Sequence, residues 1–421
     1  MDKVLIQGGT PLEGTVHVSG AKNASLLMLA AVLLTDEPCI LRNVPNLRDV
    51  NFFVKLLKNL GAEVELLSPN VWRIQAKKIH TNPPYDLVCQ MRASICLMGP
   101  LVGRLGQAAL PLPGGCVIGN RPIDLHLHGL KKLGCTIELK NGIVHVGTQQ
   151  LKGNHVFLGG RFGSTVTGTA NILMAATLSS GITRIENTAC EPEIVDLCHF
   201  LTRMGARIEG IGSPQLTIRG QQKLHGADHT VIGDRIEAGT FLIAGLVTNG
   251  HLIIDQFHTQ HLGALLHVLE NSGAKMNITA NQIEVFPCLN QLTPFEITTL
   301  PYPGFPTDLQ AQMCVLAACI PDLSLLTERI YPQRFMHVAE LQRLGVRITL
   351  EGSTAIVQGG QRLSGADVMA SDLRASAALY LAGLIARGET QVHRIYHLDR
   401  GYENFEQKLQ VVGAKLYRTA E

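Results

Sequence analysis

The feature that most constrains the fold of this chain is an internal repeat. Six times along the 421 residues, a stretch with helix-like spacing of apolar residues ends at a glycine, and a short strand-like alternation follows. These turn glycines are Gly61, Gly134, Gly205, Gly273, Gly345 and Gly413, and their separations by subtraction are 73, 71, 68, 72 and 68 residues. Spacing this regular predicts six copies of one supersecondary unit.

Each repeat also contains a second helix, which is apolar on all sides and opens with polar residues. The first is residues 19–25 (SGAKNAS) followed by the uncharged run 26–34, and related segments open at Met91, Gly163, Asp234, Thr307 and Asp372. A uniformly apolar helix buries every face, whereas the two-faced helix before each turn glycine flanks a sheet. The sequence therefore predicts β-α-β-α-β-β units with the apolar helices inside and the sheets outside.

Six such units around one centre would make an unusually large core, so three plus three is expected. The predicted fold class is α/β, with two inside-out α/β barrel domains of three repeated units each. The pattern breaks near 221–231, and the opening strand, 4–7, resembles the strand that a sixth unit lacks. We therefore expect an N-terminal domain of residues 22–229 and a C-terminal catalytic domain of residues 1–21 plus 230–421.

Composition excludes several classes of protein. The chain is 46% hydrophobic and 17% charged with a net charge of +2, which indicates a globular protein without a general nucleic-acid-binding field. Its ten cysteines form no CxxC pair and its 16 histidines no HExxH spacing, so we expect reduced thiols and no metal. No GxGxxG or Walker loop suggests a nucleotide cofactor, and we expect none.

No membrane insertion is expected either. The longest apolar run, 26–34, is much shorter than the roughly 18–20 residues that cross a bilayer. The polar, glycine-rich segment before it does not resemble a signal peptide. We expect a cytoplasmic protein, and the sequence indicates no particular protein partner.

A second informative stretch is residues 112–124 (LPGGCVIGNRPID), in which a lone cysteine, Cys116, lies among small residues and precedes Arg121 and Asp124. This composition is typical of a surface loop. A cysteine near basic groups has a lowered pKa and can serve as an acid, a base or a nucleophile. The alternative is an incidental small residue in a turn.

Basic residues recur at expected helix starts, and several of them occupy the same place in different repeats. The set is Lys22, Arg92, Arg121, Arg334, Arg374 and Arg400. If the helices converge, these side chains would bind a polyanionic substrate, since a guanidinium donates two hydrogen bonds at once to phosphate or carboxylate. The alternative is that each pairs with a local carboxylate on a solvated face.

Acidic residues stand at equivalent places, at Asp234, Glu237, Asp308 and Asp372. Asp308 follows a rigid, proline-rich approach, so either Thr307 or Asp308 would cap the next helix. The functional alternative is a general base near a hydroxyl, kept ionised by neighbouring cations.

Five segments together closely resemble the UDP-N-acetylglucosamine 1-carboxyvinyltransferase family of enolpyruvyl transferases. They are SGAKNA (19–24), PGGCVIGNRP (113–122), EPEIVD (191–196), FPTDLQAQ (305–312) and DLRASA (372–377). The resemblance runs from Met1 to about Tyr417. It implies two inside-out α/β barrels and transfer of the enolpyruvyl group of phosphoenolpyruvate to the 3-hydroxyl of UDP-N-acetylglucosamine. Phosphate is released, in the first committed step of peptidoglycan synthesis.

The resemblance also implies residue roles. Cys116 resembles the family's active-site cysteine, which protonates or covalently binds phosphoenolpyruvate and is alkylated by fosfomycin, and its loop resembles a closing lid. Lys22, Arg121 and Arg400 resemble the groups that hold phosphoenolpyruvate, and Asp308 the base or orienting group at the sugar hydroxyl. Positions matching UDP-sugar contacts are Asn23, Arg92, Arg121, Pro122, Ile123, Asp124, Leu125, Gly160, Arg161, Phe162, Gly163, Ser164 and Ile330. Asp372, Arg374 and Arg334 fall in the same cleft by analogy.

The chain departs from the family pattern at one place. Many members carry Lys-Val-Ser-Val-Gly ahead of the diphosphate-binding helix, whereas this chain reads Gly159-Gly160-Arg161-Phe162-Gly163. Arg161 or backbone amides would have to replace the missing lysine. Two other functions remain open: a shikimate-pathway enolpyruvyl transferase, which has no use for the Cys116 loop, and a non-catalytic homologue that senses a UDP-sugar.

Overall fold

The computed structural model describes residues 2–112 and 122–420, which divide into two compact units. The N-terminal unit comprises residues 20–112 and 122–232, and the C-terminal unit comprises residues 2–19 and 233–420. The chain passes between the units after Ser19 and after Ile232. The boundaries expected from the sequence, at 22 and 230, lie close to these two positions.

The turn glycines adopt one conformation throughout. All six have φ between +92° and +99°, which is the left-handed region that glycine enters without steric cost. In the first repeat the N–H of Gly61 donates to the carbonyl of Lys58 and that of Ala62 to the carbonyl of Leu57, and the other five turns repeat this pattern. This is the Schellman arrangement, in which glycine ends a helix. The predicted repeat is confirmed at the level of individual hydrogen bonds.

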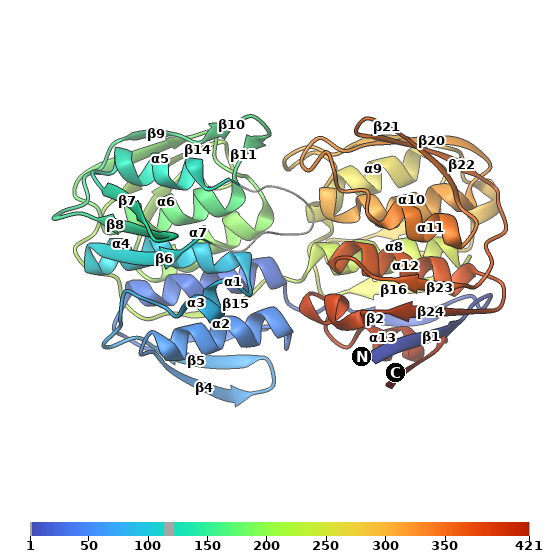
Figure 1. Cartoon of the computed structure of the whole chain (residues 1–421), viewed down its shortest axis with the longest axis horizontal. Helices are drawn as coiled ribbons and strands as arrows, with labels where there is room; N and C mark the ends of the chain where they lie inside the picture. Colours follow the sequence, from blue (N-terminus) through green and yellow to red (C-terminus); the bar gives the residue numbers. More distant parts are fainter. Residues whose placement is uncertain (1, 113–121, 421) are drawn as a thin grey trace. The chain divides into compact units, whose positions relative to one another are not determined.

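In the C-terminal unit, three apolar helices contact one another in the interior and sheets enclose them (Figure 1). The inner helices are α8 (Arg235–Val247), α10 (Gln310–Cys319) and α12 (Leu373–Ile385), and the flanking helices are α9 (Gly263–Asn271), α11 (His337–Arg343) and α13 (Phe405–Val411). Every residue of α8 and residues 374–384 of α12 are buried. Helices that are apolar on every side thus occupy the centre, as their sequences predict.

Among the described residues, the C-terminal unit has three four-stranded sheets. The strands of the first sheet, in spatial order, are β23 (Asp367–Met369), β24 (Glu389–His393), β1 (Asp2–Gln7) and β25 (Lys415–Ala420). Those of the second are β17 (Met276–Ile278), β18 (Gln282–Val285), β16 (His251–Asp255) and β2 (Glu13–His17). Those of the third are β19 (Glu296–Thr298), β20 (Asp322–Thr327), β22 (Thr354–Gly359) and β21 (Arg347–Glu351). Short 3-10 helices are η3 (Thr259–Leu262), η4 (Leu289–Gln291), η5 (Thr307–Leu309) and η6 (Ile395–Arg400). The opening strand β1 completes the sixth repeat by pairing with β24 and β25.

The N-terminal unit follows the same plan. Its inner helices are α1 (Lys22–Ala31), α4 (Met98–Leu105) and α6 (Val166–Ala176); its other helices are α2 (Arg48–Asn59), α3 (Tyr85–Val88), α5 (Asp124–Lys132) and α7 (Pro192–Arg203), with 3-10 segments η1 (Val32–Leu34) and η2 (Arg92–Leu97). One sheet consists of β15 (Asp228–Thr230), β3 (Cys39–Arg42), β5 (Val71–Gln75) and β4 (Glu63–Ser68). Another consists of β6 (Gln107–Pro111), β8 (Ile143–Gly147) and β7 (Thr136–Lys140). A third consists of β13 (Arg207–Glu209), β14 (Gln215–Arg219), β12 (Ile182–Glu186) and β9 (His155–Phe157), and β10 (Gly159–Gly160) and β11 (Gly163–Ser164) form a short pair.

The second repeat differs from the expected single apolar helix. The segment that opens at Met91 begins as the 3-10 helix η2 and becomes α-helical only at Met98. Pro100 lies in the first turn of α4, where the missing N–H of proline removes no helical hydrogen bond. The N–H of Gly99 is satisfied by Asn171 of α6, at 2.7 Å from its Oδ1. A side chain of a neighbouring inner helix thus pairs with this backbone donor.

Two further expectations concern the surface and the thiols. Across residues 2–112 and 122–420, no helix combines the length and hydropathy needed to span a bilayer. Every cysteine in the described ranges is free, and Cys39, Cys96, Cys198 and Cys314 are buried as expected. Cys89 and Cys319 are only partly buried, because each lies at the end of a helix.

Candidate active site

The C-terminal unit brings one carboxylate between two guanidinium groups. Nη1 of Arg334 lies 2.7 Å from Oδ1 of Asp308, and Nη2 of Arg374 lies 2.8 Å from Oδ2. Both arginines are almost fully buried, whereas the Asp308 side chain is 26% exposed. The carboxylate therefore lies at the mouth of a buried cationic pair.

The electrostatics of this group favour its charged state. Burial alone would raise the pKa of Asp308, but Arg374 and Arg334 outweigh it and hold that pKa well below its usual value of 3.8. Asp308 in turn raises the pKa of both arginines against the opposing effect of burial. The Asp308 carboxylate is therefore ionised at neutral pH, and Asp372 and Asp234 add further negative charge near Arg334 and Arg374.

A second carboxylate is buried beside this cluster and contacts the residue that precedes Asp308. Glu328 is 0% exposed, and its Oε2 accepts a hydrogen bond from the hydroxyl of Thr307, 2.8 Å away. Its Oε1 accepts hydrogen bonds from the N–H groups of Ile330 and Tyr331, at 2.8 and 2.9 Å. Glu328 thus orders the predicted contact residue Ile330 and the residue before Asp308. The sequence analysis missed Glu328, because nothing in its local pattern marks a fully buried glutamate.

The expected helix caps are present at some positions and not at others. Asp372 accepts hydrogen bonds from the N–H groups of Arg374 and Ala375, at 2.9 and 3.1 Å, and Asp234 caps α8 in the same way. The prediction that Thr307 or Asp308 caps the next helix is wrong, since neither side chain bonds to the first turn of η5 or α10. The ion pairs to Arg334 and Arg374 replace the cap.

Two of the cations do not lie at helix starts. Arg334 lies in a turn that precedes α11, and Arg400 is the last residue of η6. The expectation of a helix-start location is therefore wrong for both residues, since α11 begins only at His337 and α13 only at Phe405. Arg374, by contrast, lies in the first turn of α12 as predicted.

In the N-terminal unit, the start of α1 carries Lys22 and Asn23. Nζ of Lys22 lies 3.6 Å from Oδ2 of Asp49, and both side chains are largely buried. The N-cap residue, Ala21, makes no side-chain cap and no acidic residue lies in the first turn, so this helix start carries only the positive end of the helix dipole and the lysine ammonium. Arg92 opens the equivalent segment η2 and is partly buried.

The structure brings the two predicted UDP-sugar segments of this unit together. Pro122 and Ile123 precede α5, which begins at Asp124, and the next residue, Leu125, packs under the β10–β11 hairpin that contains Gly160. A methyl group added at Gly160 would lie 3.1 Å from Cδ1 of Leu125. Gly163 and Ser164 form the second strand of this hairpin, and Arg161 packs over the ring of Phe162 at its tip.

The structure also gives a reason for glycine at position 159. A Cβ at Gly159 would lie 2.4 Å from the ring of Phe157 and 2.9 Å from the amide of Asn187. A lysine there requires the ring of Phe157 to move. Arg161 is exposed on the neighbouring turn, so it is the nearest cation in this hairpin.

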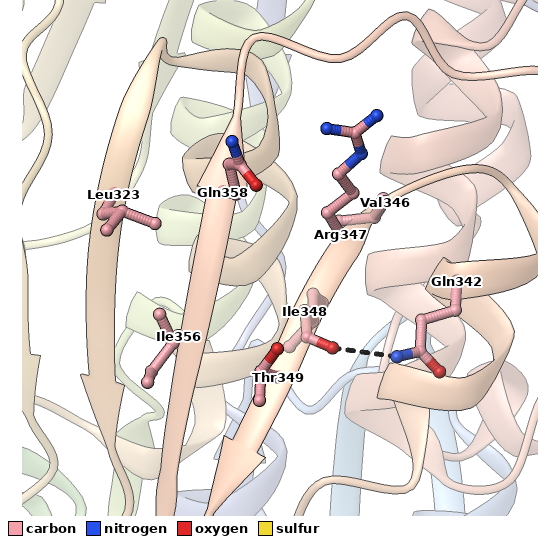
Figure 2. A pocket seen from close by; sticks show the side chains of 8 residues that line it. All are labelled: Leu323, Gln342, Val346, Arg347, Ile348, Thr349, Ile356 and Gln358. Carbon is pink, nitrogen blue, oxygen red and sulfur yellow. Dashed lines mark hydrogen bonds between the residues drawn. The ribbon is translucent and has the colours of Figure 1, made fainter.

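Three predictions cannot be compared with the structure. Cys116 and Arg121 lie outside residues 2–112 and 122–420, and so does the loop between Pro113 and Arg121. A pocket of about 530 Å³ is found elsewhere, over the outer sheet of β20, β21 and β22 (Figure 2). Figure 2 shows Gln342 donating to the carbonyl of Ile348 at its edge, and none of the predicted site residues lines it.

Neither Arg235 nor His126 was predicted as a site residue. Arg235 is buried beside the ring of Tyr302 and is the first residue of α8, as Lys22 is of α1, whereas Arg374 is the second residue of α12. That repeat equivalence was the signal that identified the other cations. His126 is buried in α5 and bonds to Asn171 and Thr167, and burial and then Arg92 lower its pKa to about 3.

Comparison with known proteins identifies the family. A family model described as EPSP synthase (3-phosphoshikimate 1-carboxyvinyltransferase) matches residues 6–409. A protein of Methylacidiphilum infernorum named UDP-N-acetylglucosamine 1-carboxyvinyltransferase is 52% identical over 418 residues, covering 99% of each chain. One of the same name from Koribacter versatilis is 50% identical over 425 residues, covering 100% of this chain and 97% of its own. This chain belongs to the UDP-N-acetylglucosamine 1-carboxyvinyltransferase family.

Solved structures agree with this assignment. The enolpyruvyl transferase NikO from Streptomyces tendae superposes with a TM-score of 0.91 at 26% identity, covering 100% of this chain and 99% of NikO. An EPSP synthase from Acinetobacter baumannii gives 0.77 at 16% identity over the whole of both chains, which is a similarity of fold. The inside-out α/β architecture predicted from the repeats is thereby confirmed for a member of the UDP-N-acetylglucosamine 1-carboxyvinyltransferase family.

Proposed function

We propose that this chain transfers the enolpyruvyl group of phosphoenolpyruvate to the 3-hydroxyl of UDP-N-acetylglucosamine and releases phosphate. The observation that carries the proposal is the identity of about one half, over the full length, with relatives that bear this activity in their name. The structurally similar EPSP synthase shares only 16% of its residues with this chain. A role in cytoplasmic peptidoglycan synthesis follows from the reaction, and sensitivity to fosfomycin follows from the assignment of Cys116 as the residue that this compound alkylates.

Asp308 is our candidate for the group that receives the sugar hydroxyl. With both oxygens bound to guanidiniums and its pKa held low, Asp308 is ionised at neutral pH and accepts a hydrogen bond readily. Such a carboxylate is a weak base, so we assign it first to orienting the hydroxyl oxygen toward C2 of phosphoenolpyruvate. It takes up the proton only as the C–O bond forms and the hydroxyl becomes acidic.

The cations are candidates for the substrate anions. Lys22 and the start of α1 suit a phosphate, because the positive end of a helix dipole and an ammonium both attract negative charge. We assign Lys22, Arg121 and Arg400 to phosphoenolpyruvate. We assign Asn23, Arg92, residues 121–125 and 160–164, and Ile330 to the UDP-sugar.

Proton balance requires one more group. Addition of the sugar oxygen to C2 turns the methylene carbon C3 into a methyl group, so an acid must deliver a proton to C3. Elimination then removes a proton from C3 as the C2–O bond to phosphate breaks. We assign the delivery to Cys116, which as a thiol can give a proton and, as a thiolate, take one back.

The test is a phosphate-release assay on the purified chain with two acceptors, UDP-N-acetylglucosamine and shikimate 3-phosphate. We expect phosphoenolpyruvate plus UDP-N-acetylglucosamine to release phosphate and form the enolpyruvyl sugar. Release with shikimate 3-phosphate instead would support the alternative transferase. Binding of the UDP-sugar without turnover would support the sensing homologue, and either result would overturn the proposal.

Cys116 is tested by replacement with Ala. We expect C116A to lose nearly all turnover and to keep its affinity for the UDP-sugar, because the thiol is needed for proton transfer and not for binding. Cys89 provides the control, since it is free, partly buried and not among the predicted site residues, and C89A should retain activity. Normal turnover by C116A would remove Cys116 from the mechanism.

A further inference from the structure

One buried tyrosine of the C-terminal unit contacts all three of its inner helices. Tyr402 is 3% exposed and follows η6 by two residues. Its hydroxyl oxygen lies 2.9 Å from Oγ1 of Thr240 on α8 and 3.3 Å from Nε2 of Gln312 on α10. The guanidinium carbon of Arg374 on α12 lies 5.4 Å from the centre of its ring. Tyr402 therefore contacts side chains of α8, α10 and α12.

The hydrogen bonds fix the orientation of this hydroxyl. Thr240 has one hydroxyl proton and donates it to the carbonyl of Ile236, at 2.8 Å. In the Tyr402–Thr240 bond, Tyr402 must therefore be the donor. Nε2 of Gln312 donates to the carbonyl of Asp308, at 3.1 Å, and its second proton points toward Thr240 and Tyr402. The lone pairs of the Tyr402 hydroxyl oxygen can then accept a hydrogen bond from Gln312 and face the guanidinium of Arg374.

The guanidinium of Arg374 needs a neighbouring group that limits its movement. Arg374 is 3% exposed, one of its terminal nitrogens binds Asp308, and the other, Nη1, has no hydrogen-bond partner within the described ranges. A buried guanidinium with an unused donor can rotate or withdraw unless a neighbouring group limits it. The face of an aromatic ring attracts a cation and limits its movement.

We propose that Tyr402 is a positioning residue that holds the guanidinium of Arg374, and through it the carboxylate of Asp308, in the geometry needed for enolpyruvyl transfer. The ring fixes the plane of the guanidinium, and the hydroxyl locks the ring against α8 and α10. The activity part of this inference rests on the proposed function. Tyr402 acts through Arg374 and is not assigned any contact with substrate.

Tyr380 supplies a matched control. It is 0% exposed on α12, and its hydroxyl donates to Oε1 of Glu406 at 2.9 Å. Like Tyr402, it packs against the ring of Phe405. Tyr380→Phe and Tyr402→Phe thus each remove one buried, hydrogen-bonded hydroxyl from the same aromatic cluster, but Tyr380 is not in the set of side chains that touches Arg374.

The experiment measures kcat and KM for both substrates, and the melting temperature, in the full chain and in Y402F, Y402L and Y380F. We expect similar losses of melting temperature in Y402F and Y380F. Only Y402F should lower kcat, by about tenfold, because small displacements of catalytic groups reduce rates steeply. Y402L, which loses the ring as well, should lower it further. A Y402F variant with wild-type kcat, or an equal loss of kcat in Y380F, would overturn the inference.

A second measurement does not depend on turnover. Arginine side-chain NMR of the full chain without substrate, with Arg374 assigned from R374K, reports rotation of its guanidinium. We expect slow rotation in the wild type and in Y380F and faster rotation in Y402F. Equal rotation in all three would overturn the inference even if the chain is active. Wild-type protein without turnover but with slowed rotation would instead count against the proposed function alone. If Y402F does not fold, T240V, which removes the acceptor of the Tyr402 proton, should show the same changes.

Discussion

Replacing Asp308 by Asn would test whether this carboxylate is what permits two guanidiniums to be buried together. Arg334 and Arg374 are 7% and 3% exposed, and each binds a different oxygen of Asp308, at 2.7 and 2.8 Å. Asn keeps the size of the side chain, but it removes the charge and places an amide N–H against one of the guanidiniums. Removing one partner of a buried ion pair typically costs about 3–5 kcal/mol. We expect D308N to lower the free energy of unfolding of the C-terminal unit by about 3 kcal/mol, the low end of that range, because Asp308 is partly exposed.

The pH dependence of this loss follows from the direction of the pKa shift. Burial opposes ionisation of Asp308, but the two arginines prevail and hold its pKa well below 3.8. The unfolded chain then binds a proton at Asp308 at a higher pH than the folded chain does. The stabilising contribution is fully present above the ordinary pKa of the group and is lost as the pH falls through the lower pKa of the folded state. The difference in stability between wild type and D308N should be constant near neutrality and shrink below about pH 4.

The assay must report on the correct unit. The single tryptophan, Trp72, lies in β5 of the N-terminal unit, so its fluorescence does not follow the loss. Hydrogen exchange of the backbone amides of α10 and α12, measured in urea at pH 7 and at low pH, follows the loss of stability of the C-terminal unit. Asp228 is the control, since it also makes two hydrogen bonds to an arginine, Arg42, but both side chains are about half exposed. D228N should cost at most about 1 kcal/mol. If D308N is as stable as wild type at pH 7, the carboxylate does not offset the two arginines.

Two stability predictions follow from local geometry. Gly61 and Gly413 both have φ of +99°, but a Cβ at Gly61 would lie 2.5 Å from the carbonyl oxygen of Lys78, whereas at Gly413 it meets nothing closer than 3.9 Å. G413A should cost about 1 kcal/mol and G61A clearly more, measured by urea unfolding; equal costs would mean that the close approach is relieved. Thr165 caps α6 by accepting the N–H of Gly168 at 3.2 Å, so T165A should cost about 1 kcal/mol in the same assay, and no loss would show that the cap is replaced by water.

The repeats were predictable because each depends on a local physical requirement. A helix that ends in the left-handed conformation needs glycine there, so the sequence records each turn directly. The apolar helices were equally readable, because burial on every face requires apolar residues all round, as in α8 and α12. The 3-10 start at Arg92 was not predicted, and the Asn171 side chain that accepts the N–H of Gly99 just beyond it is 72 residues away in the sequence.

The candidate site was predictable only in part. The repeat equivalence indicated where Arg374 would lie, but it did not indicate that Arg374 binds Asp308, 66 residues away. The local pattern favoured a helix cap for Asp308, because a cap needs only neighbouring residues, whereas an ion pair depends on how α10 and α12 pack. Glu328 was missed for the same reason, since its partners Thr299 and Thr307 come from other elements.

The charge balance at Asp308 also predicts how the C-terminal unit responds to anions. Arg334 and Arg374 together carry two positive charges, and Asp308 supplies one negative charge to them. Any phosphate or carboxylate that binds these arginines must share them with Asp308 and is repelled by it. In D308N this competitor is absent, so inorganic phosphate should bind to the unit about tenfold more tightly, a difference of about 1.4 kcal/mol. Calorimetric titration of phosphate at pH 7 measures this, with D228N as the control. Equal affinities in wild type and D308N would mean that anions bind elsewhere and that the arginine pair serves Asp308 alone.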